Sequence, residues 1–156
     1  MKEIPLTKGL FALVDDEDFD RLNQWNWRAK KSRKTFYADR HFEKDGRRTY
    51  VHMHRLIVDA PLELEVDHKD GNGLNNQRYN LRICTQKQNR RNISVQKNNR
   101  LGYKGVHQES KGSFSARITV DKKLMWLGSY KNPIDAAKAY DLAATKHHGE
   151  FARTNF

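Results

Sequence analysis

Residues 66–89 read VDHKDGNGLNNQRYNLRICTQKQN. The stretch begins with an acid and an imidazole, Asp67 and His68, and continues into a turn rich in glycine and asparagine. Two further asparagines, Asn80 and Asn89, return at spaced positions. A carboxylate, an imidazole and side-chain amides can supply a metal ligand, a proton acceptor and supporting hydrogen bonds in one small pocket. This stretch is therefore the first candidate for a site with chemistry.

The same stretch predicts a strand, a long loop, a second strand and a helix. Residues 66–68 and 81–84 have strand character, and the glycines and asparagines between them tolerate the positive φ of turns. Thr85 can cap a helix over residues 86–91. The first strand then carries the Asp-His pair and the helix carries Asn89, so the fold can bring these groups face to face.

Residues before this stretch predict further short strands and helices. An apolar run at 10–14 has the length of a strand, and the acidic cluster 15–18 can start a short amphipathic helix. Two strands, 35–41 and 47–53, flank an Asp-Gly sequence that favours a hairpin turn. Residues 52–58 can form a short helix that ends before a proline.

Four side chains in this part have alternative interpretations. Trp25 and Trp27 either stack on bases or pack in a small core, and we expect packing because each ring contributes a large buried area. His52 and His54 are candidate metal ligands. Because no further ligand lies at a convincing helical spacing, we expect structural or phosphate-contacting roles for both.

The chain after Asn89 changes character twice. Residues 90–101 are polar and basic, and they read equally as a linker or as an exposed extension of the preceding helix. Either would place cations, Arg90 and Arg91 among them, against phosphates. Three strands at 103–107, 113–120 and 124–130 follow, and then a helix over 133–148 with Asn132 as its N-cap and Gly149 past its end. So few elements favour binding through a surface over catalysis in a cleft.

Composition limits the class of protein. The 156 residues carry 30 Lys and Arg against 19 Asp and Glu, a formal charge of +11, which indicates a polyanionic partner such as nucleic acid. Cys84 is the single cysteine, which excludes an intramolecular disulfide and a zinc site with paired cysteine ligands. No apolar run approaches the ~20 residues of a membrane span, and the amino terminus lacks a secretory signal. We expect an intracellular protein with no membrane partner.

Residues 50–92 resemble the HNH nuclease module of phage and intron-encoded endonucleases. The matching segments are 53–57, 66–68, 70–72, 75–76, 80–82 and Asn89, in the same order and spacing. Residues 1–50 are similar to the leader that precedes this module in phage versions, above all at 5–9 and 14–18. The resemblance implies an α+β protein with a ββα-metal, or His-Me finger, fold in which two strands and a helix hold one divalent cation.

By position, the resemblance also implies a role for each polar residue of the central stretch. Asp67 and Asn89 would be the metal ligands, His68 the general base, and Asn80 the residue that holds the loop and helps to orient His68. Many family members have histidine at the position of Asn89. Since an amide oxygen is a hard ligand, we expect Mg²⁺, with Mn²⁺ as the second candidate, in preference to zinc.

These residue types suit phosphodiester hydrolysis. The attacking water must lose a proton, and an imidazole with an ordinary pKa near ~6.5 can accept it at neutral pH. A cation held by Asp67 and Asn89 would stabilise the charge that develops on the leaving oxygen. His68 would therefore act on the attacking water, and one metal ion on the leaving oxygen.

Residues 101–156 resemble the Apetala-type, or ethylene-response-factor, DNA-binding domain of plants. The matching segments are 103–106, 114–118, 126–130, 136–144 and 148–156. In that family a three-stranded sheet lies in the major groove and a helix supports it from behind. By position, the resemblance implies that the following side chains face DNA: Lys104, His107, Arg117, Thr119 and Trp126.

The match to the plant domain is not uniform. The plant family usually has arginine where this chain has Lys104 and His107, so bidentate readers of guanine are missing and the plant target sequence does not carry over. Trp126 either contacts DNA or packs on the sheet, and both interpretations stay open. Three further aromatic residues are expected in the core: Tyr130, Tyr140 and Phe151.

The sequence thus predicts a metal-dependent DNA endonuclease of homing or mobile-element type, encoded by a phage-like genome. It would nick or cut double-stranded DNA as a monomer. The predicted division is a leader at 1–49, an HNH module at 50–92, a basic linker at 93–101 and a DNA-binding domain at 102–156. One alternative is a non-catalytic DNA-binding regulator with a decayed nuclease, against which the intact central residues argue. An RNA-binding or ribosome-associated protein would explain the charge but not the Asp-His-Asn spacing.

Overall fold

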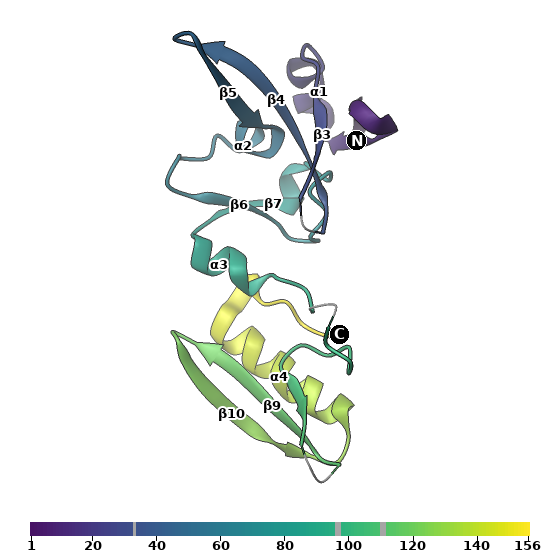
Figure 1. Ribbon diagram of the computed structural model, residues 1–156, viewed down its shortest axis with the longest axis vertical. Coiled ribbons are helices and arrows are strands. Elements are labelled where there is room, and N and C mark those ends of the chain that lie inside the picture. The colour runs from purple at the N-terminus through teal and green to yellow at the C-terminus, as the bar shows by residue number, and fades with distance from the viewer. Residues whose placement is uncertain (33, 96–97, 110–111) are drawn as a thin grey trace. The chain divides into compact units, whose positions relative to one another are not determined.

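The computed structural model describes residues 1–32, 34–95, 98–109 and 112–156 (Figure 1). The chain divides into two compact units, Met1–Asn89 and Arg90–Phe156. Both contain small antiparallel sheets and few helices, which confirms the predicted mixture of strands and helices. Among the described residues, no helix has the length and apolar character needed to cross a membrane.

The first unit begins with two small sheets. Its elements are β1 (Lys2–Pro5), β2 (Phe11–Val14), α1 (Asp16–Leu22), β3 (Arg28–Lys31), β4 (Phe36–Lys44), β5 (Arg47–His52) and α2 (Met53–Ile57). β1 pairs with β2, and the other three strands form a sheet in the order β3-β4-β5. The β4–β5 turn has φ of 52° at Asp45 and 69° at Gly46, as a tight Asp-Gly hairpin turn requires. The predicted strands and helices are confirmed, whereas β1 and β3 were not predicted.

The core of the first unit lies between these sheets and α1. Its fully buried side chains include Ile4, Val14, Leu22 and Met53. Trp27 is also buried, and its indole Nε1 donates a hydrogen bond to the carbonyl of Leu22 at 2.8 Å. Trp25 meets Trp27 edge to face at 6.2 Å between ring centroids. The prediction that both tryptophans pack in a core is therefore confirmed.

The central stretch completes the first unit. It forms β6 (Glu65–His68), a 3-10 turn at Arg78–Asn80, β7 (Leu81–Cys84) and α3 (Gln86–Arg91), and β6 pairs antiparallel with β7. At the start of α3, Thr85 Oγ1 accepts from the Gln88 amide at 3.3 Å, and Gln88 Oε1 accepts from the Thr85 amide at 2.8 Å. This reciprocal cap explains why the helix begins where the sequence predicts it.

The second unit is a three-stranded sheet with one helix. Its elements are β8 (Val106–Gln108), β9 (Phe114–Val120), β10 (Lys123–Tyr130) and α4 (Pro133–His148), with strand order β10-β9-β8. Asn132 Oδ1 accepts from the Asp135 amide at 2.9 Å, so the predicted N-cap is confirmed. Residues 92–95 and 98–105 belong to neither a helix nor a strand, while 96 and 97 of the predicted linker lie outside the described residues. The predicted four-part division stays a prediction.

One face of α4 packs on this sheet (Figure 1). Ala136, Ala137 and Ala144 are fully buried, so small side chains allow the helix to approach closely. Tyr140 and Phe151 are also buried, and Tyr130 packs against the same cluster. The three aromatic residues expected in the core are therefore found there.

Candidate functional site

The last two residues of β6 carry the predicted ligand and the predicted base. The register pairs Asp67 with Arg82 and His68 with Leu81 on β7. Successive side chains on a strand point to opposite faces, so Asp67 and His68 diverge at the end of β6. Both are buried, with 5% and 4% of their surface exposed. Each therefore has a separate environment.

The Asp67 face of β6 gathers oxygen donors. Asp67 Oδ2 accepts hydrogen bonds from Arg82 at 2.8 Å (Nε) and 2.6 Å (Nη2), which fixes the carboxylate. Glu65 lies two residues before Asp67 and so shares its face. Asn89 on α3 donates from Nδ2 to Glu65 Oε2 at 2.6 Å. Helix α3 thus brings the predicted second ligand, Asn89, against this face of the strand pair.

The Asp67 face carries the oxygen ligands that a hard divalent cation prefers. Asp67 and Glu65 offer carboxylates and Asn89 an amide oxygen, which are ligands that Mg²⁺ accepts. Cys84 faces the same side, but burial, with the charges of Asp67 and Glu65, raises the pKa of its thiol to about 11 and keeps it protonated. In the part of the chain that is described, no group of three or more His, Cys, Asp or Glu could hold a metal ion. The amide oxygen of Asn89 and water molecules would have to complete the coordination of a cation.

The His68 face is aromatic. The His68 ring centroid lies 5.6 Å from that of Tyr37 and 5.1 Å from that of His54. Asn76 Oδ1 lies 3.4 Å from His68 Nε2. Burial lowers the pKa of His68, while Asn76 and two nearby carboxylates oppose this effect. The imidazole is therefore neutral at pH 7, which is the form that can accept a proton.

His52 and His54 extend the aromatic cluster. Their rings stack at 5.1 Å with an angle of 7° between planes, and both also contact Tyr37. Burial, followed by the neighbouring histidines, lowers the pKa of His54 to about 2. Neither histidine belongs to a metal cluster in the described residues. The structural role expected for the two histidines agrees with this packing.

Asn80 organises the loop between β6 and β7. It is 1% exposed, its Oδ1 accepts from the Asp70 amide at 3.0 Å, and its Nδ2 donates to Asp70 Oδ1 at 3.0 Å and to the Asn75 carbonyl at 2.8 Å. These bonds close the loop. The side-chain amide beside His68 is that of Asn76. A catalytic role for Asn80 stays a prediction.

Several residues of the site were missed by sequence reasoning. They are Tyr37, Glu65, Asn76 and Arg82. Glu65 and Arg82 had a signal, because alternation on β6 and the strand pairing place them beside Asp67. No sequence signal pointed to Tyr37, because it lies on β4, far from residues 66–89 in the sequence.

Gly73 lets the loop approach β4. A Cβ on Gly73 would lie 2.4 Å from the Phe36 carbonyl oxygen and 2.5 Å from the Tyr37 ring. We expect Gly73→Ala to destabilise the first unit by about 1–3 kcal/mol, because one neighbour is backbone and the Tyr37 ring packs against His54 and His68. Urea unfolding followed by the fluorescence of Trp25 and Trp27, in a Trp126→Phe background, measures this loss.

A double variant tests whether the steric contact causes that loss. Tyr37→Ala removes the ring that the new methyl group meets, so the double variant is expected to lose less than the sum of the two single variants. Gly46→Ala, where a Cβ meets nothing within 4 Å but φ is +69°, measures the cost of a glycine change that strains the backbone without a clash. Strict additivity would contradict the close approach of the loop to Tyr37.

The exposed sheet face of the second unit carries most of the predicted DNA contacts. The register pairs Arg117 with Trp126 and aligns His107 with Ser115, so His107, Arg117, Thr119 and Trp126 share one face. Trp126 is 65% exposed, so it is not buried in the core of this unit, and its contact with DNA stays a prediction. Arg117 Nη2 donates to Glu109 Oε1 at 2.6 Å, which holds its guanidinium in place.

The remaining predicted DNA contacts lie elsewhere. Lys104 precedes β8, and its Nζ donates to the Arg91 carbonyl at 2.7 Å. Burial, followed by the charge of Arg153, lowers the pKa of Lys104 to about 8. Arg90 is exposed at the end of α3. Arg91 Nη2 lies 3.9 Å from Asp121 Oδ1. The structure therefore does not bring these three residues onto the sheet face with the other four.

Comparison with known proteins agrees with this geometry. Residues 51–91 match the family model described as HNH endonuclease. The chain is 29% identical over 150 residues to an uncharacterized HNH endonuclease of Acanthamoeba polyphaga mimivirus, which covers 95% of this chain and 76% of that protein.

Plant proteins match part of the chain. An ethylene-responsive transcription factor of Medicago truncatula is 39% identical over 71 residues, 44% of this chain and 30% of that protein. Another, from Arabidopsis thaliana, is 31% identical over 99 residues, 60% of each protein. An Arabidopsis AP2/ERF and B3 domain-containing transcription factor is 48% identical over 44 residues, 28% of this chain and 13% of that protein. The chain therefore combines a segment that matches HNH endonucleases, residues 51–91, with similarity to AP2/ERF proteins, and both predicted resemblances are confirmed.

Proposed function

We propose that this protein is a metal-dependent endonuclease that hydrolyses phosphodiester bonds of double-stranded DNA. β6, β7 and α3 would form a ββα-metal site, and the exposed sheet of the second unit would position it on DNA. The observation that carries the proposal is the separation at the end of β6. Oxygen donors gather on the Asp67 face, and a neutral imidazole, His68, lies on the other.

Each residue of the proposed site has its own role. His68 takes a proton from the attacking water. Its lowered pKa keeps the imidazole unprotonated and so able to accept that proton. Asp67 and Asn89 would hold the cation, Mg²⁺ in preference to Mn²⁺, with Glu65 beside them. A bound divalent cation stabilises charge on the leaving oxygen. Arg82 pairs with Asp67 and orients its carboxylate, and Asn80 closes the loop that carries Asn76 towards His68.

The second unit supplies affinity and site preference. His107, Arg117, Thr119 and Trp126 form an exposed face of antiparallel strands, and the major groove of DNA admits a β-ribbon. Tethering this surface to the nuclease raises the effective concentration of the cutting site on DNA. We also infer a homing or mobile-element setting, in which a monomer with one site nicks a strand.

Relaxation of a supercoiled plasmid tests the function. We expect the protein to relax the plasmid with Mg²⁺ and to stop when a chelator is added. Asp67→Ala should abolish relaxation because the carboxylate ligand is lost, whereas Asp20→Ala, an exposed acid on α1, should leave it unchanged. Relaxation that survives both the chelator and Asp67→Ala would refute the metal site. Tight DNA binding without any cutting would favour a regulator instead.

A further inference from the structure

We propose that the solvent-facing side of the β3-β4-β5 sheet binds the phosphate backbone of DNA beside the bond that is cut. The inference rests on the proposed function and adds a second DNA surface within the first unit. We call this surface the basic face, and it is made by Arg28 and Lys30 on β3, His41 on β4, and Arg48 and Tyr50 on β5. Two acids on β4, Asp39 and Glu43, lie on the same side.

The strand register defines the basic face. Arg28 pairs with Asp39 and Asp39 with His52, while His41 pairs with Tyr50, so these side chains point to one side. Ala29 and Ala38 alternate with them and are buried in the core. One side of the sheet therefore packs on the core, and Lys30, His41, Arg48 and Tyr50 are exposed on the other.

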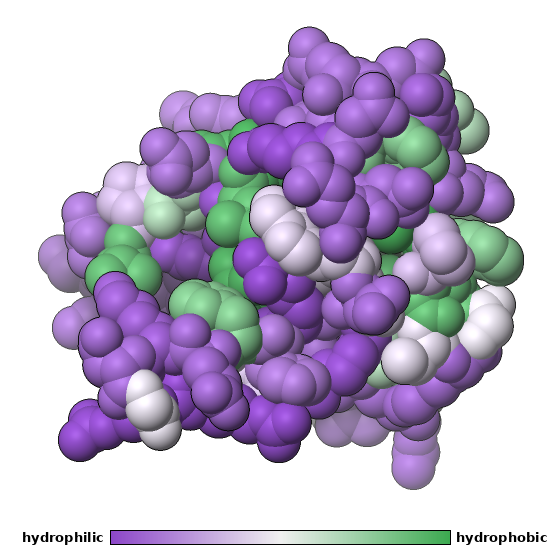
Figure 2. All heavy atoms as spheres, turned by 90° about the horizontal axis from the view of Figure 1, so that it is seen from above, coloured by the Kyte–Doolittle hydropathy of each residue, from purple (hydrophilic) through white to green (hydrophobic). Residues whose placement is uncertain are grey.

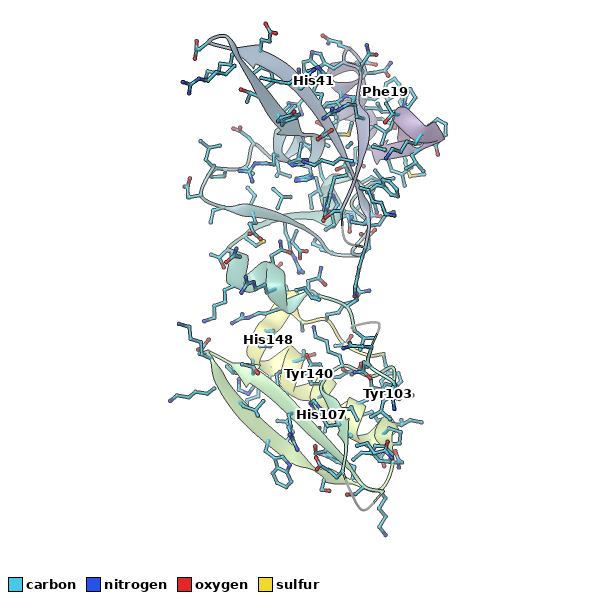
Figure 3. All side chains as sticks on the ribbon, viewed as in Figure 1. Phe19, His41, Tyr103, His107, Tyr140 and His148 are labelled. Atoms are coloured by element: carbon cyan, nitrogen blue, oxygen red, sulfur yellow. The ribbon has the colours of Figure 1, made fainter. Side chains whose placement is uncertain are left out.

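The basic face leads to the candidate base. Tyr37 and Asp39 share a side of β4, and the Tyr37 ring lies 6.2 Å from that of His52 and 5.6 Å from that of His68. At the other end, His41 lies on the β4–β5 hairpin (Figure 3) and 3.0 Å from Arg48. A DNA strand lying along this face would thus arrive at His68 without crossing the sheet.

The charges along the basic face suit phosphates. A depression of about 450 Å³ on the sheet is lined by Thr7, Lys8, Arg28, Ala29, Lys30, Lys31, Asp39 and Tyr50. Two of its cations, Arg28 and Lys30, belong to the basic face, and two more, Lys8 and Lys31, line the depression beside that face; Asp39 is its one carboxylate. Figure 2 shows a view of the molecule that is mainly hydrophilic, with separate hydrophobic patches. An excess of cations in the depression favours a polyanion as the partner.

The cations of the basic face are held in place before any ligand binds. Asp39 is fully buried and accepts from Arg28 at 3.2 Å (Nε) and 3.0 Å (Nη2), and Lys30 Nζ lies 4.0 Å from its other oxygen. Arg28 and Lys30 also lie 5.5 Å and 5.9 Å from the Tyr50 ring centroid. Side chains fixed in this way lose less conformational freedom on binding.

Two charge-matched double variants test the inference. Lys30→Gln/Arg48→Gln removes two cations of the basic face. Lys44→Gln/Arg47→Gln also removes two cations, from exposed residues that pair at the hairpin tip and point to the opposite side. The full chain is titrated with a labelled duplex over a range of salt concentrations. A chelator is present so that no DNA is cut, and circular dichroism confirms that each variant is folded.

The salt dependence of binding gives the result. The slope of log K against log salt is expected to fall by about 0.9 for each phosphate that the protein no longer neutralises, so the basic-face variant should have a shallower slope than wild type. The control variant should keep the wild-type slope. Equal slopes in the two variants would overturn the inference and leave the nuclease proposal intact. A shallower slope in a protein that never cuts would refute the nuclease proposal alone.

Discussion

His68→Ala is expected to slow metal-dependent plasmid relaxation by about 10²- to 10⁴-fold, the usual contribution of a general base. The variant loses the imidazole that accepts the proton of the attacking water, while the oxygen donors on the Asp67 face stay in place. Time courses of relaxation with Mg²⁺ measure the loss. DNA affinity should not change, because His68 is 4% exposed and offers little surface to the duplex.

Two further measurements make this result specific. His147→Ala, a histidine on α4 in the second unit, should cut at the wild-type rate. Because burial lowers the pKa of His68, wild-type cutting should persist as the pH falls below 6.5, the ordinary value for histidine. Equal loss of supercoiled plasmid in wild type and His68→Ala would refute the assignment of the base.

Gly105→Ala is expected to destabilise the second unit by about 2–5 kcal/mol, from overpacking and from a side chain at positive φ. A Cβ at Gly105 would lie 1.9 Å from the ring of Tyr140, which is 5% exposed and has no space to retreat. The backbone there has a φ of +75°. Amide hydrogen exchange in α4, measured by mass spectrometry, reports the free energy of opening.

Gly102→Ala is the matched control for Gly105→Ala. Its φ is +74°, but a Cβ there meets nothing within 4 Å, so only the conformational strain remains. If the units act as modules, Gly105→Ala should weaken DNA binding through loss of the exposed sheet while metal-dependent cutting continues. Equal effects of the two substitutions on exchange would contradict the close approach of Gly105 to Tyr140.

Local patterns in the sequence predicted most of the elements. The Asp-Gly turn, the cap at Thr85 and the Asn132-Pro133 start of α4 are short-range signals, and each lies where it was expected. The strands β1 and β3 were missed because they are short and have little apolar alternation; β3 reads RAKK. Their pairing depends on partners elsewhere in the chain, which local propensity does not describe.

The site was predicted in part. Asp67, His68, Asn80 and Asn89 come from one continuous stretch, and the structure brings Asn89 to Glu65 on the same face as Asp67. The roles of these four residues stay predictions. Four predicted DNA contacts share one sheet face, as the alternation of side chains along β9 predicts. Lys104 lies before β8, and its Nζ donates to the backbone carbonyl of Arg91 instead.

Turns, caps and alternation act over a few residues, so the order of the elements followed from the sequence, as did the positive charge and the residue types of the central stretch. What surrounds those residues depends on tertiary packing. Burial beside Tyr37 and His54 makes His68 neutral, and the register of the β3-β4-β5 sheet aligns Arg28, Lys30 and Arg48 on one side. Burial and register are properties of segments distant in sequence, so no local pattern could have revealed them.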